Sequence, residues 1–172
     1  MSINMENITV RYALREELEA VNRIRRQVND VHVNGRPDIF RADAWEHIRD
    51  IVYKRFEDED SGVIAAFWGE ELVGYAQVQY IHRSASPYNR ERRLYHIEEF
   101  GVDEKHRRMG VATALIQFAR QDAREKGFPK LELDMWQFNE GALAFYEAMS
   151  FVTFRRYMEC FVEEENGRKE NE

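Results

Sequence analysis

The stretch from Leu94 to Ala119, LYHIEEFGVDEKHRRMGVATALIQFA, constrains the fold of this chain more than any other segment. Apolar residues up to Val102 indicate a strand, and a short polar loop containing Arg107 and Gly110 follows. The residues after this loop have the apolar spacing of an amphipathic helix. Because a strand–loop–helix unit directs main-chain N–H groups and a helix dipole at one point, the segment predicts a phosphate-binding loop.

The details of the loop refine this prediction. Gly110 permits a close approach of the backbone, and the small Ala112 and Thr113 leave the first helical turn open. Arg107 and Arg108 supply charged donors. The loop is not a P-loop, since no Gly-Lys-Ser/Thr follows, and it lacks the three glycines of a dinucleotide fingerprint.

The hydrophobic periodicity predicts ten elements in the order β-α-α-β-β-β-α-β-α-β. The second and third strands form a hairpin around Gly69-Glu70, and a polar loop covers 82–92. Hairpins followed by a crossover helix indicate an α/β (α+β) fold with a mixed, mostly antiparallel twisted sheet flanked by helices. Strands are expected at 8–13, 63–68, 72–81, 94–102, 131–135 and 151–161, and helices at 14–31, 45–56, 110–126 and 139–149.

Composition excludes several classes of protein. The 172 residues fit a single domain, with 163–172 as a frayed polar tail. A formal charge of −7 argues against a nucleic-acid partner. Cys160 is the only cysteine, so we expect neither a disulfide nor a metal site. We find no signal peptide and no membrane-spanning stretch, which makes the cytoplasm the default location and a membrane partner unexpected.

Two motifs resemble the GNAT superfamily of N-acetyltransferases. The segment VDEKHRRMGVATALI resembles that family's V-D-x-x-x-R-x-x-G-[IV]-[GA]-x-x-L-[IL], and NEGALAFYEAMSF resembles its N-x-x-A-x-x-F-Y-x-x-x-G-F. The order of elements agrees over nearly the whole chain, so the resemblance implies the GNAT fold. Ser150 departs from the pattern because it stands where the family has Gly, at a position that often adopts a left-handed turn.

The resemblance implies acetyl-CoA as the cofactor. Its pyrophosphate would lie on the loop after Val102, its pantetheine arm would lie along the preceding strand, and main-chain N–H groups there would polarise the thioester carbonyl. Asn139 is expected to contact this arm, although a plain helix N-cap is the alternative. The implied cofactor-binding residues are Phe100, Gly101, Val102, Arg107, Arg108, Met109, Gly110, Val111, Ala112, Thr113, Asn139, Phe145 and Tyr146.

Acetyl transfer needs a base for the amine and an acid for the thiolate leaving group. The resemblance assigns Tyr146 as the general acid; the alternative is a core tyrosine. His96 and Glu98 alternate on a strand face with apolar neighbours, which makes them candidates for the base, either directly or through a water. Glu98 is favoured, because IEEFGV resembles the L-E-D-F-F-V of spermidine/spermine acetyltransferases.

Glu99 should face the other way unless a β-bulge turns it, in which case we expect it to contact the ammonium of the substrate. The structural alternative is that Glu98 and Glu99 pair with Arg92, Arg93 or another cation.

We therefore expect an acyltransferase that moves an acetyl group, in a ternary complex, to a primary amine of a small cationic metabolite or drug. Acetylation of a protein N-terminus or lysine is one alternative. A catalytically silent acyl-CoA-binding module and a pure interaction domain are two others. The resemblance also raises the expectation of a homodimer that forms through the last strands.

Overall fold

A six-stranded sheet runs through the centre of the protein, whose computed structural model describes residues 3–5 and 7–162. Its strands follow chain order, β1-β2-β3-β4-β5-β6, and are antiparallel except for the parallel pair β5–β6. The mixed, mostly antiparallel sheet predicted from the sequence is thus confirmed. The strands are β1 (Ile3–Met5), β2 (Ile8–Tyr12), β3 (Ser61–Trp68), β4 (Glu71–Arg83), β5 (Arg92–Val102) and β6 (Leu131–Leu133).

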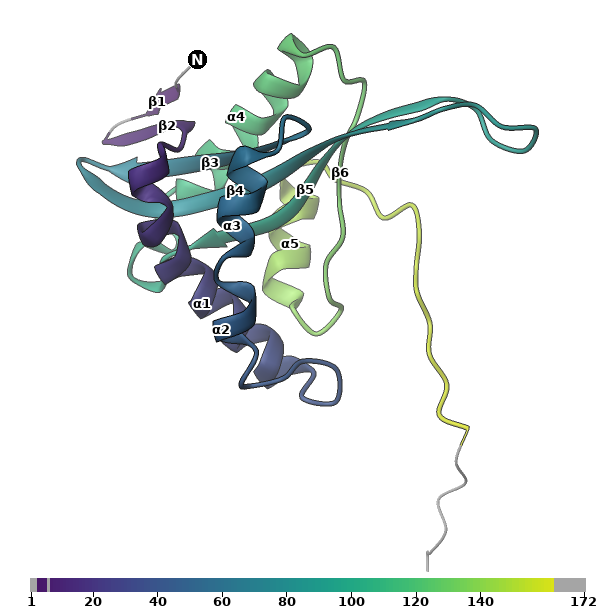
Figure 1. Cartoon of the computed structure of the whole chain (residues 1–172), viewed down its shortest axis with the longest axis horizontal. Coiled ribbons are helices and arrows are strands. Elements are labelled where there is room, and N and C mark those ends of the chain that lie inside the picture. Colours follow the sequence, from purple (N-terminus) through teal and green to yellow (C-terminus); the bar gives the residue numbers. More distant parts are fainter. Residues whose placement is uncertain (1–2, 6, 163–172) are drawn as a thin grey trace, which may run out of the picture.

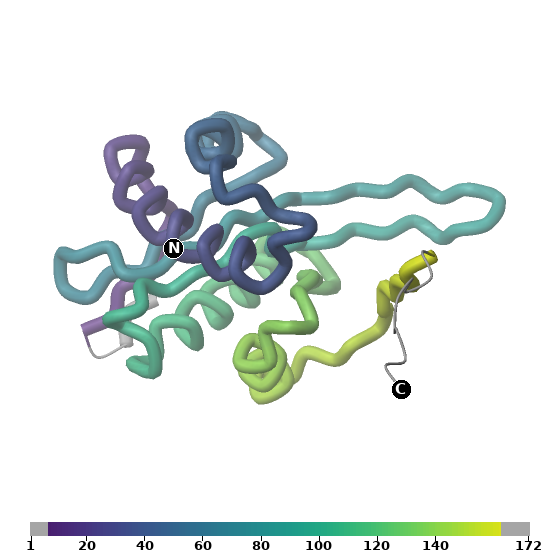
Figure 2. Tube along the Cα trace, turned by 90° about the horizontal axis from the view of Figure 1, so that it is seen from below, coloured from purple at the N-terminus to yellow at the C-terminus, as the bar shows by residue number. Residues whose placement is uncertain are grey.

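Helices cover both faces of the sheet. Figure 2 shows the first three on one side and the last two on the other. The helices are α1 (Leu18–Gly35), α2 (Trp45–Ile48), α3 (Ile51–Glu57), α4 (Val111–Glu125) and α5 (Glu140–Ala148), with 3-10 turns η1 (Arg15–Glu17) and η2 (Glu104–His106). The predicted helix over 45–56 is divided into α2 and α3.

The core has two parts, one on each face of the sheet. Leu18, Val21 and Ile24 repeat at helical spacing on α1 and are fully buried against β3 and β4. On the other face, α4 buries Leu115 and Phe118 against the opposite side of the same strands. The sheet therefore lies between two layers of helices, and α4 packs against its centre.

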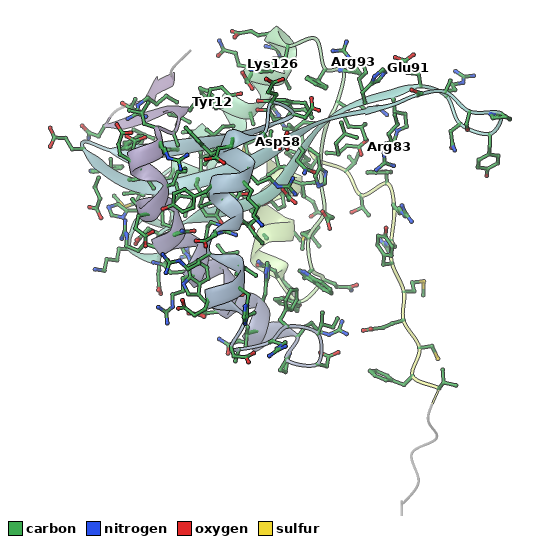
Figure 3. All side chains as sticks on the ribbon, in the orientation of Figure 1. Tyr12, Asp58, Arg83, Glu91, Arg93 and Lys126 are labelled. Carbon is green, nitrogen blue, oxygen red and sulfur yellow. The ribbon has the colours of Figure 1, made fainter. Side chains whose placement is uncertain are left out.

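The C-terminal end of α4 is held by a polar cluster. The carboxylate of Asp122 is buried and accepts a hydrogen bond from the hydroxyl of Tyr95 at 2.8 Å. Tyr12 also donates to Asp122, and the ammonium of Lys126 lies 3.1 Å from the Tyr12 hydroxyl. Tyr12 and Lys126 are labelled in Figure 3. Because buried polar groups must be satisfied, these bonds fix the rotation of α4 against the sheet.

β4 and β5 extend well beyond the body as a two-stranded ribbon (Figure 1). Their pairing continues to Arg83–Arg92, so both strands intrude into the predicted loop 82–92. Tyr88, at the tip, is 94% exposed.

Two predictions about the ends of the sheet differ from the structure. The strand predicted at 151–161 is wrong: this segment has no strand partner among the described residues, and its large apolar side chains after Phe151 are exposed. The strand β1 was not predicted, because three residues are too few to show a period. The predicted frayed tail, 163–172, lies outside the described residues.

Candidate functional site

The loop between β5 and α4 ends in a helix N-terminus that no side chain caps. Gly110 is the N-cap, with a left-handed φ of +87°, and the first helical bond runs from the Ala114 amide to its carbonyl at 3.0 Å. The amides of Val111, Ala112 and Thr113 therefore have no acceptor within α4. These donors and the positive end of the helix dipole meet beside the exposed Gly110.

Contacts to α1 hold this loop in place. The buried Asp103 pairs with Arg23 at 2.7 Å and accepts from the Lys105 amide at 3.0 Å. Gln27 accepts from the Glu104 amide at 3.1 Å. Burial alone would raise the pKa of Asp103, but the bonds from Lys105 and Gln27 and the charge of Arg23 outweigh it, so this pKa is lowered. The ionised carboxylate anchors the loop in its observed shape.

The exposed part of the loop fits a phosphate group. Arg107, Arg108 and Met109 are exposed, and Arg108 adopts a left-handed φ of +64°. A Cβ added to Gly110 would lie 3.6 Å from Ile8, so glycine is required here by its dihedral angle rather than by a clash. The loop thus combines open amides with two guanidinium groups, which is the donor set of an anion site.

β5 and β6 separate beyond the pair Ile97–Leu133. In the described chain, the part of β5 after Ile97 is paired on one side only, to β4. Phe100 lies in the opening, with its ring 6.2 Å from that of Phe145 and 6.1 Å from that of Tyr146. The split places one free strand edge beside α5, next to the start of α4.

A β-bulge lies at the mouth of this split. Glu99 pairs with Gln77 and Ile97 with Val78, which leaves Glu98 without an opposite residue. The extra residue reverses the alternation of side chains, so both glutamates contact residues of the α1–α3 face while Phe100 packs against the α4 cluster. The bulge anticipated for Glu99 is confirmed, but the single face predicted for His96, Glu98 and Phe100 is wrong.

The carboxylate of Glu99 accepts hydrogen bonds from several side chains of the protein itself. Arg25, which is buried on α1, donates to both carboxylate oxygens at 2.7 and 2.9 Å. The Gln77 amide donates at 2.9 Å and the Tyr75 hydroxyl at 3.3 Å. The predicted contact of Glu99 with an acceptor amine stays a prediction, and Arg25 is the partner that such an amine would have to join.

Glu98 is paired with Arg55 of α3. The guanidinium donates to its carboxylate at 2.6 Å. With its amide oxygen turned toward Arg55, Gln79 accepts from the same guanidinium at 2.6 and 2.9 Å. Glu98 is exposed, and its second carboxylate oxygen has no hydrogen-bond partner among the described residues.

His96 lies on β5, two residues before Glu98. Its side chain is 23% exposed, and its Nε2 lies 3.6 Å from the carboxylate of Asp134, which is 86% exposed. His96 pairs with Glu132 in the parallel ladder, at the last rungs before the split. His96 and Glu98 therefore flank the point where the two strands separate.

Tyr146 projects from α5 into the aromatic lining of the split. Its ring contacts Phe100, Phe145 and Phe151. Burial raises the pKa of Tyr146 to about 12. The phenol is therefore fully protonated near neutral pH.

Both ends of α5 have well-defined caps. Asn139 accepts from the Ala142 amide at 3.1 Å, so the helix N-cap reading is confirmed. At the other end, Ser150 has a φ of +62°, and the amides of Ser150 and Phe151 donate to the carbonyls of Glu147 and Tyr146. This is a Schellman motif, and the left-handed turn expected at Ser150 is present.

The predicted residues of both motifs thus lie around the opening between β5 and β6. Sequence reasoning missed Arg25, Arg55 and Gln77, the partners of the two glutamates. One signal was available, since the polar residues Asn22 and Arg25 interrupt the apolar face of α1. Among residues 3–5 and 7–162, no His, Cys, Asp and Glu group suited to a metal ion occurs, and no helix has the length and apolarity of a membrane span.

A family model described as the acetyltransferase (GNAT) family matches residues 23–151. Streptothricin acetyltransferase of Escherichia coli is 30% identical over 139 residues, which cover 80% of this chain and 75% of that protein. Human N-acetyltransferase 8 is 40% identical over 65 residues, which cover 38% of this chain but only 28% of the relative. Thialysine N-epsilon-acetyltransferase of Caenorhabditis elegans is 29% identical over 92 residues, 53% of this chain and 54% of that one.

Solved structures share the fold. A mutant of the BH1408 protein of Bacillus halodurans superposes with a TM-score of 0.84 at 25% identity, over 90% of this chain and 99% of that one. Aminoglycoside N-acetyltransferase AAC(6')-Iy in complex with CoA gives a TM-score of 0.67 at 19% identity, over 96% of this chain and 97% of that one.

Proposed function

The chain belongs to the GNAT acetyltransferase family and is an acyltransferase, and on that premise we propose that it transfers an acetyl group from acetyl-CoA to a primary amine of a small cationic metabolite or drug. The observation that carries the proposal is the uncapped N-terminus of α4 beside the β5–β6 split. The uncapped helix N-terminus suits a diphosphate, and the open strand edge in the split suits an extended chain. Acetyl-CoA contains both of these groups.

The residues present fit acetyl-CoA. The amides of Val111, Ala112 and Thr113, with Arg107 and Arg108, would hold the pyrophosphate. The free edge of β5 from Phe100 to Val102 would receive the pantetheine arm as an added strand. The main-chain N–H groups of this strand edge would polarise the thioester carbonyl. The aromatic rings of Phe100 and Phe145 would exclude water there.

Tyr146 suits the role of general acid. A leaving thiolate needs a proton donor, and a phenol with a pKa of about 12 still carries its proton at neutral pH. The ring is fixed between Phe100 and Phe151, so little rotational freedom is lost when the hydroxyl donates. The acid thus lies on α5, on the opposite side of the split from the bulge.

We assign the base to the bulge side of the split, with Glu98 ahead of His96. A primary alkylamine is mostly protonated at neutral pH and must lose a proton before it attacks. Glu98 has one oxygen bonded to Arg55, while His96 lies against Asp134. The accessible carboxylate of Glu98 can accept the proton directly or through a water.

Three observations support a small cationic acceptor. The formal charge of the chain is −7, which favours a cationic partner. Asp134 is strongly exposed beside His96 and offers a carboxylate to an ammonium group. Relatives and structural neighbours include streptothricin, thialysine and aminoglycoside acetyltransferases, whose names describe amines. Because Arg25 and Arg55 already pair with Glu99 and Glu98, these two acids add little free negative charge.

A CoA-release assay over a panel of amines tests the proposal. The panel contains polyamines, aminoglycosides, streptothricin-like amines, lysine analogues and N-terminal peptides. We expect CoA release with a subset of the small amines and none with the peptides. Thermal stabilisation by acetyl-CoA without release on any amine would contradict the transferase function and favour a silent binding module. Release on peptides alone would replace the proposed acceptor with a protein.

A further inference from the structure

The projecting part of the β4–β5 ribbon, residues 82–93, is basic in an acidic chain (Figure 1). It contains four arginines and one glutamate, a formal charge of +3, whereas the whole chain carries −7. The glutamate, Glu91, contacts His82 at 2.9 Å, and in the ladder Arg83 lies directly opposite Arg92. Like charges at opposite positions destabilise an antiparallel pair. The ribbon thus keeps a feature that its own stability disfavours, which indicates a surface that an anionic group covers.

Other parts of the chain neutralise only some of these arginines. Arg92 pairs with Glu132 of β6 at 2.7 Å, and Arg93 donates to a main-chain carbonyl at the end of α4 at 3.4 Å. Within residues 3–5 and 7–162, the guanidinium groups of Arg83 and Arg90 form no ion pair, and both side chains are exposed. We call these two residues the tip arginines.

The turn between α3 and β3 carries the complementary charge. Residues 57–60 are four consecutive acids, and all of them are exposed. The first two, Glu57 and Asp58, contact arginines of their own chain. The carboxylates of the last two, Glu59 and Asp60, have no cationic partner in the described part of the chain. We call Glu59 and Asp60 the acidic turn.

The acidic turn lies at the base of the ribbon. The carbonyl of Asp60 accepts a hydrogen bond from the Tyr80 amide at 2.8 Å. Arg83 lies three residues farther along β4, which is about 10 Å at the rise of a β-strand. Figure 3 shows Arg83 on the ribbon and Asp58, which precedes the acidic turn, on the body. The ribbon therefore has a negative base and a positive outer part.

We propose that two copies of the chain associate with their ribbons in opposite directions, so that the tip arginines of each copy bind the acidic turn of the other. A second copy is the occupant because one chain supplies both groups, two unpaired cations and two unpaired carboxylates. A two-fold arrangement satisfies both groups at once. A nucleic acid is disfavoured, because a chain with a charge of −7 would repel it. The contact uses neither β6 nor the segment after α5.

Two charge-reversal variants of the full chain test the proposal. The tip variant is Arg83→Glu/Arg90→Glu, and the turn variant is Glu59→Arg/Asp60→Arg. All four side chains are exposed, so the substitutions leave the fold of a single copy intact. Thermal unfolding confirms this for each variant.

The matched control is Arg26→Glu/Arg41→Glu. It changes the net charge as much as the tip variant does, but at exposed positions on α1 and in the loop that follows α1. Sedimentation velocity measures association, and hydrogen exchange reports whether the amides of residues 57–60 and 83–91 become protected.

We expect the wild type and the control to associate at low salt. Because salt screens exposed ion pairs, the dissociation constant should rise about 10-fold between about 50 and 500 mM salt. Either charge-reversal variant alone should associate about 100-fold more weakly, since like charges then meet at both contacts. An equimolar mixture of the tip and turn variants should associate again, because both contacts of a mixed pair join opposite charges.

The mixture separates this contact from any other route to a dimer. A wild type that stays a single chain at every salt concentration would overturn the proposal, and so would an association that both variants retain. A mixture that fails to associate would also overturn it, because the tip arginines and the acidic turn would then not meet. A single-chain wild type whose 83–91 amides are protected only by a DNA or RNA duplex would replace the second copy with a nucleic acid.

Discussion

The guanidinium of Arg25 bonds both carboxylate oxygens of Glu99, with Nε–Oε2 at 2.7 Å and Nη2–Oε1 at 2.9 Å. This pair joins the middle of α1 to the bulge of β5. Burial acts to lower the pKa of Arg25, but the bonds and charge of Glu99 outweigh it and raise this pKa further. The guanidinium therefore stays charged at any ordinary pH, and its bonds to Glu99 fix the wall of the split.

Removal of Arg25 should destabilise the protein, because it leaves the Glu99 carboxylate without its main partner. The loss of one member of a buried pair costs about 3–5 kcal/mol, and the 31% exposure of Glu99 places Arg25→Met at about 2–3 kcal/mol. Urea unfolding measures this change, with the exposed neighbour Arg26→Met as the control. Arg25→Met/Glu99→Met should recover part of the loss. Equal effects of Arg25→Met and Arg26→Met would contradict a structural role.

Tyr146→Phe should lower kcat about 100-fold and leave CoA affinity unchanged, because it removes only the proton donor. The pKa of about 12 sets the sign of the pH dependence: the hydroxyl is protonated below that value and cannot donate above it. The wild-type rate should therefore show no loss from this group up to about pH 10. Stopped-flow and steady-state kinetics check both points, with Tyr88→Phe as the control. A variant as fast as the wild type would exclude Tyr146 as the acid.

Gly110→Glu should abolish binding of acetyl-CoA. The substitution forces an L-residue into a φ of +87° and adds a negative charge where the pyrophosphate is expected. Gly69→Glu is the matched control, since Gly69 has a φ of +61° in a hairpin turn with open space around it. Both variants should lose similar stability, by about 1–2 kcal/mol, but only Gly110→Glu should lose calorimetric binding. Normal binding by Gly110→Glu would move the phosphate site elsewhere.

Glu98→Gln tests the identity of the base. If Glu98 accepts the proton of the amine, its protonation causes the fall of kcat/KM at acidic pH, and the glutamine variant loses that dependence along with most of its rate. His96→Gln is the comparison, because His96 borders the same split. Profiles of kcat/KM against pH for both variants decide the assignment. An unchanged profile in Glu98→Gln and an altered one in His96→Gln would transfer the role to His96.

The sequence was sufficient to predict the elements that obey a simple period. α4 repeats its apolar residues at helical spacing from Val111 to Ala119, and Gly110 marks its start. The hairpin at Gly69 was equally clear, since two apolar runs flank a short polar turn. For these elements, local pattern and tertiary packing agree.

The bulge shows why the faces of β5 could not be predicted. A period of two places Phe100 with His96, but one inserted residue moves Phe100 to the α4 side. At the insertion, Glu98 and Glu99 contact Arg55 and Arg25, which lie more than 40 residues away and which no local pattern reveals. The strand predicted at 151–161 failed for a related reason, since a strand needs a neighbour and none of the described residues pairs with this segment.

Ser150→Gly should stabilise the protein. Ser150 adopts a φ of +62° at the C-terminal end of α5, where a left-handed conformation costs an L-residue about 1–2 kcal/mol. Glycine avoids this strain but loses about 0.5–1 kcal/mol through the entropy of the unfolded chain, so the net gain should be about 0.5–1 kcal/mol. Asn7→Gly is the comparison, because Asn7 has the same φ of +62° and asparagine tolerates it better, which should make its gain smaller. Thermal and urea unfolding measure both changes. A destabilised Ser150→Gly would mean that the serine side chain itself supports the turn that carries Phe151 onto Tyr146.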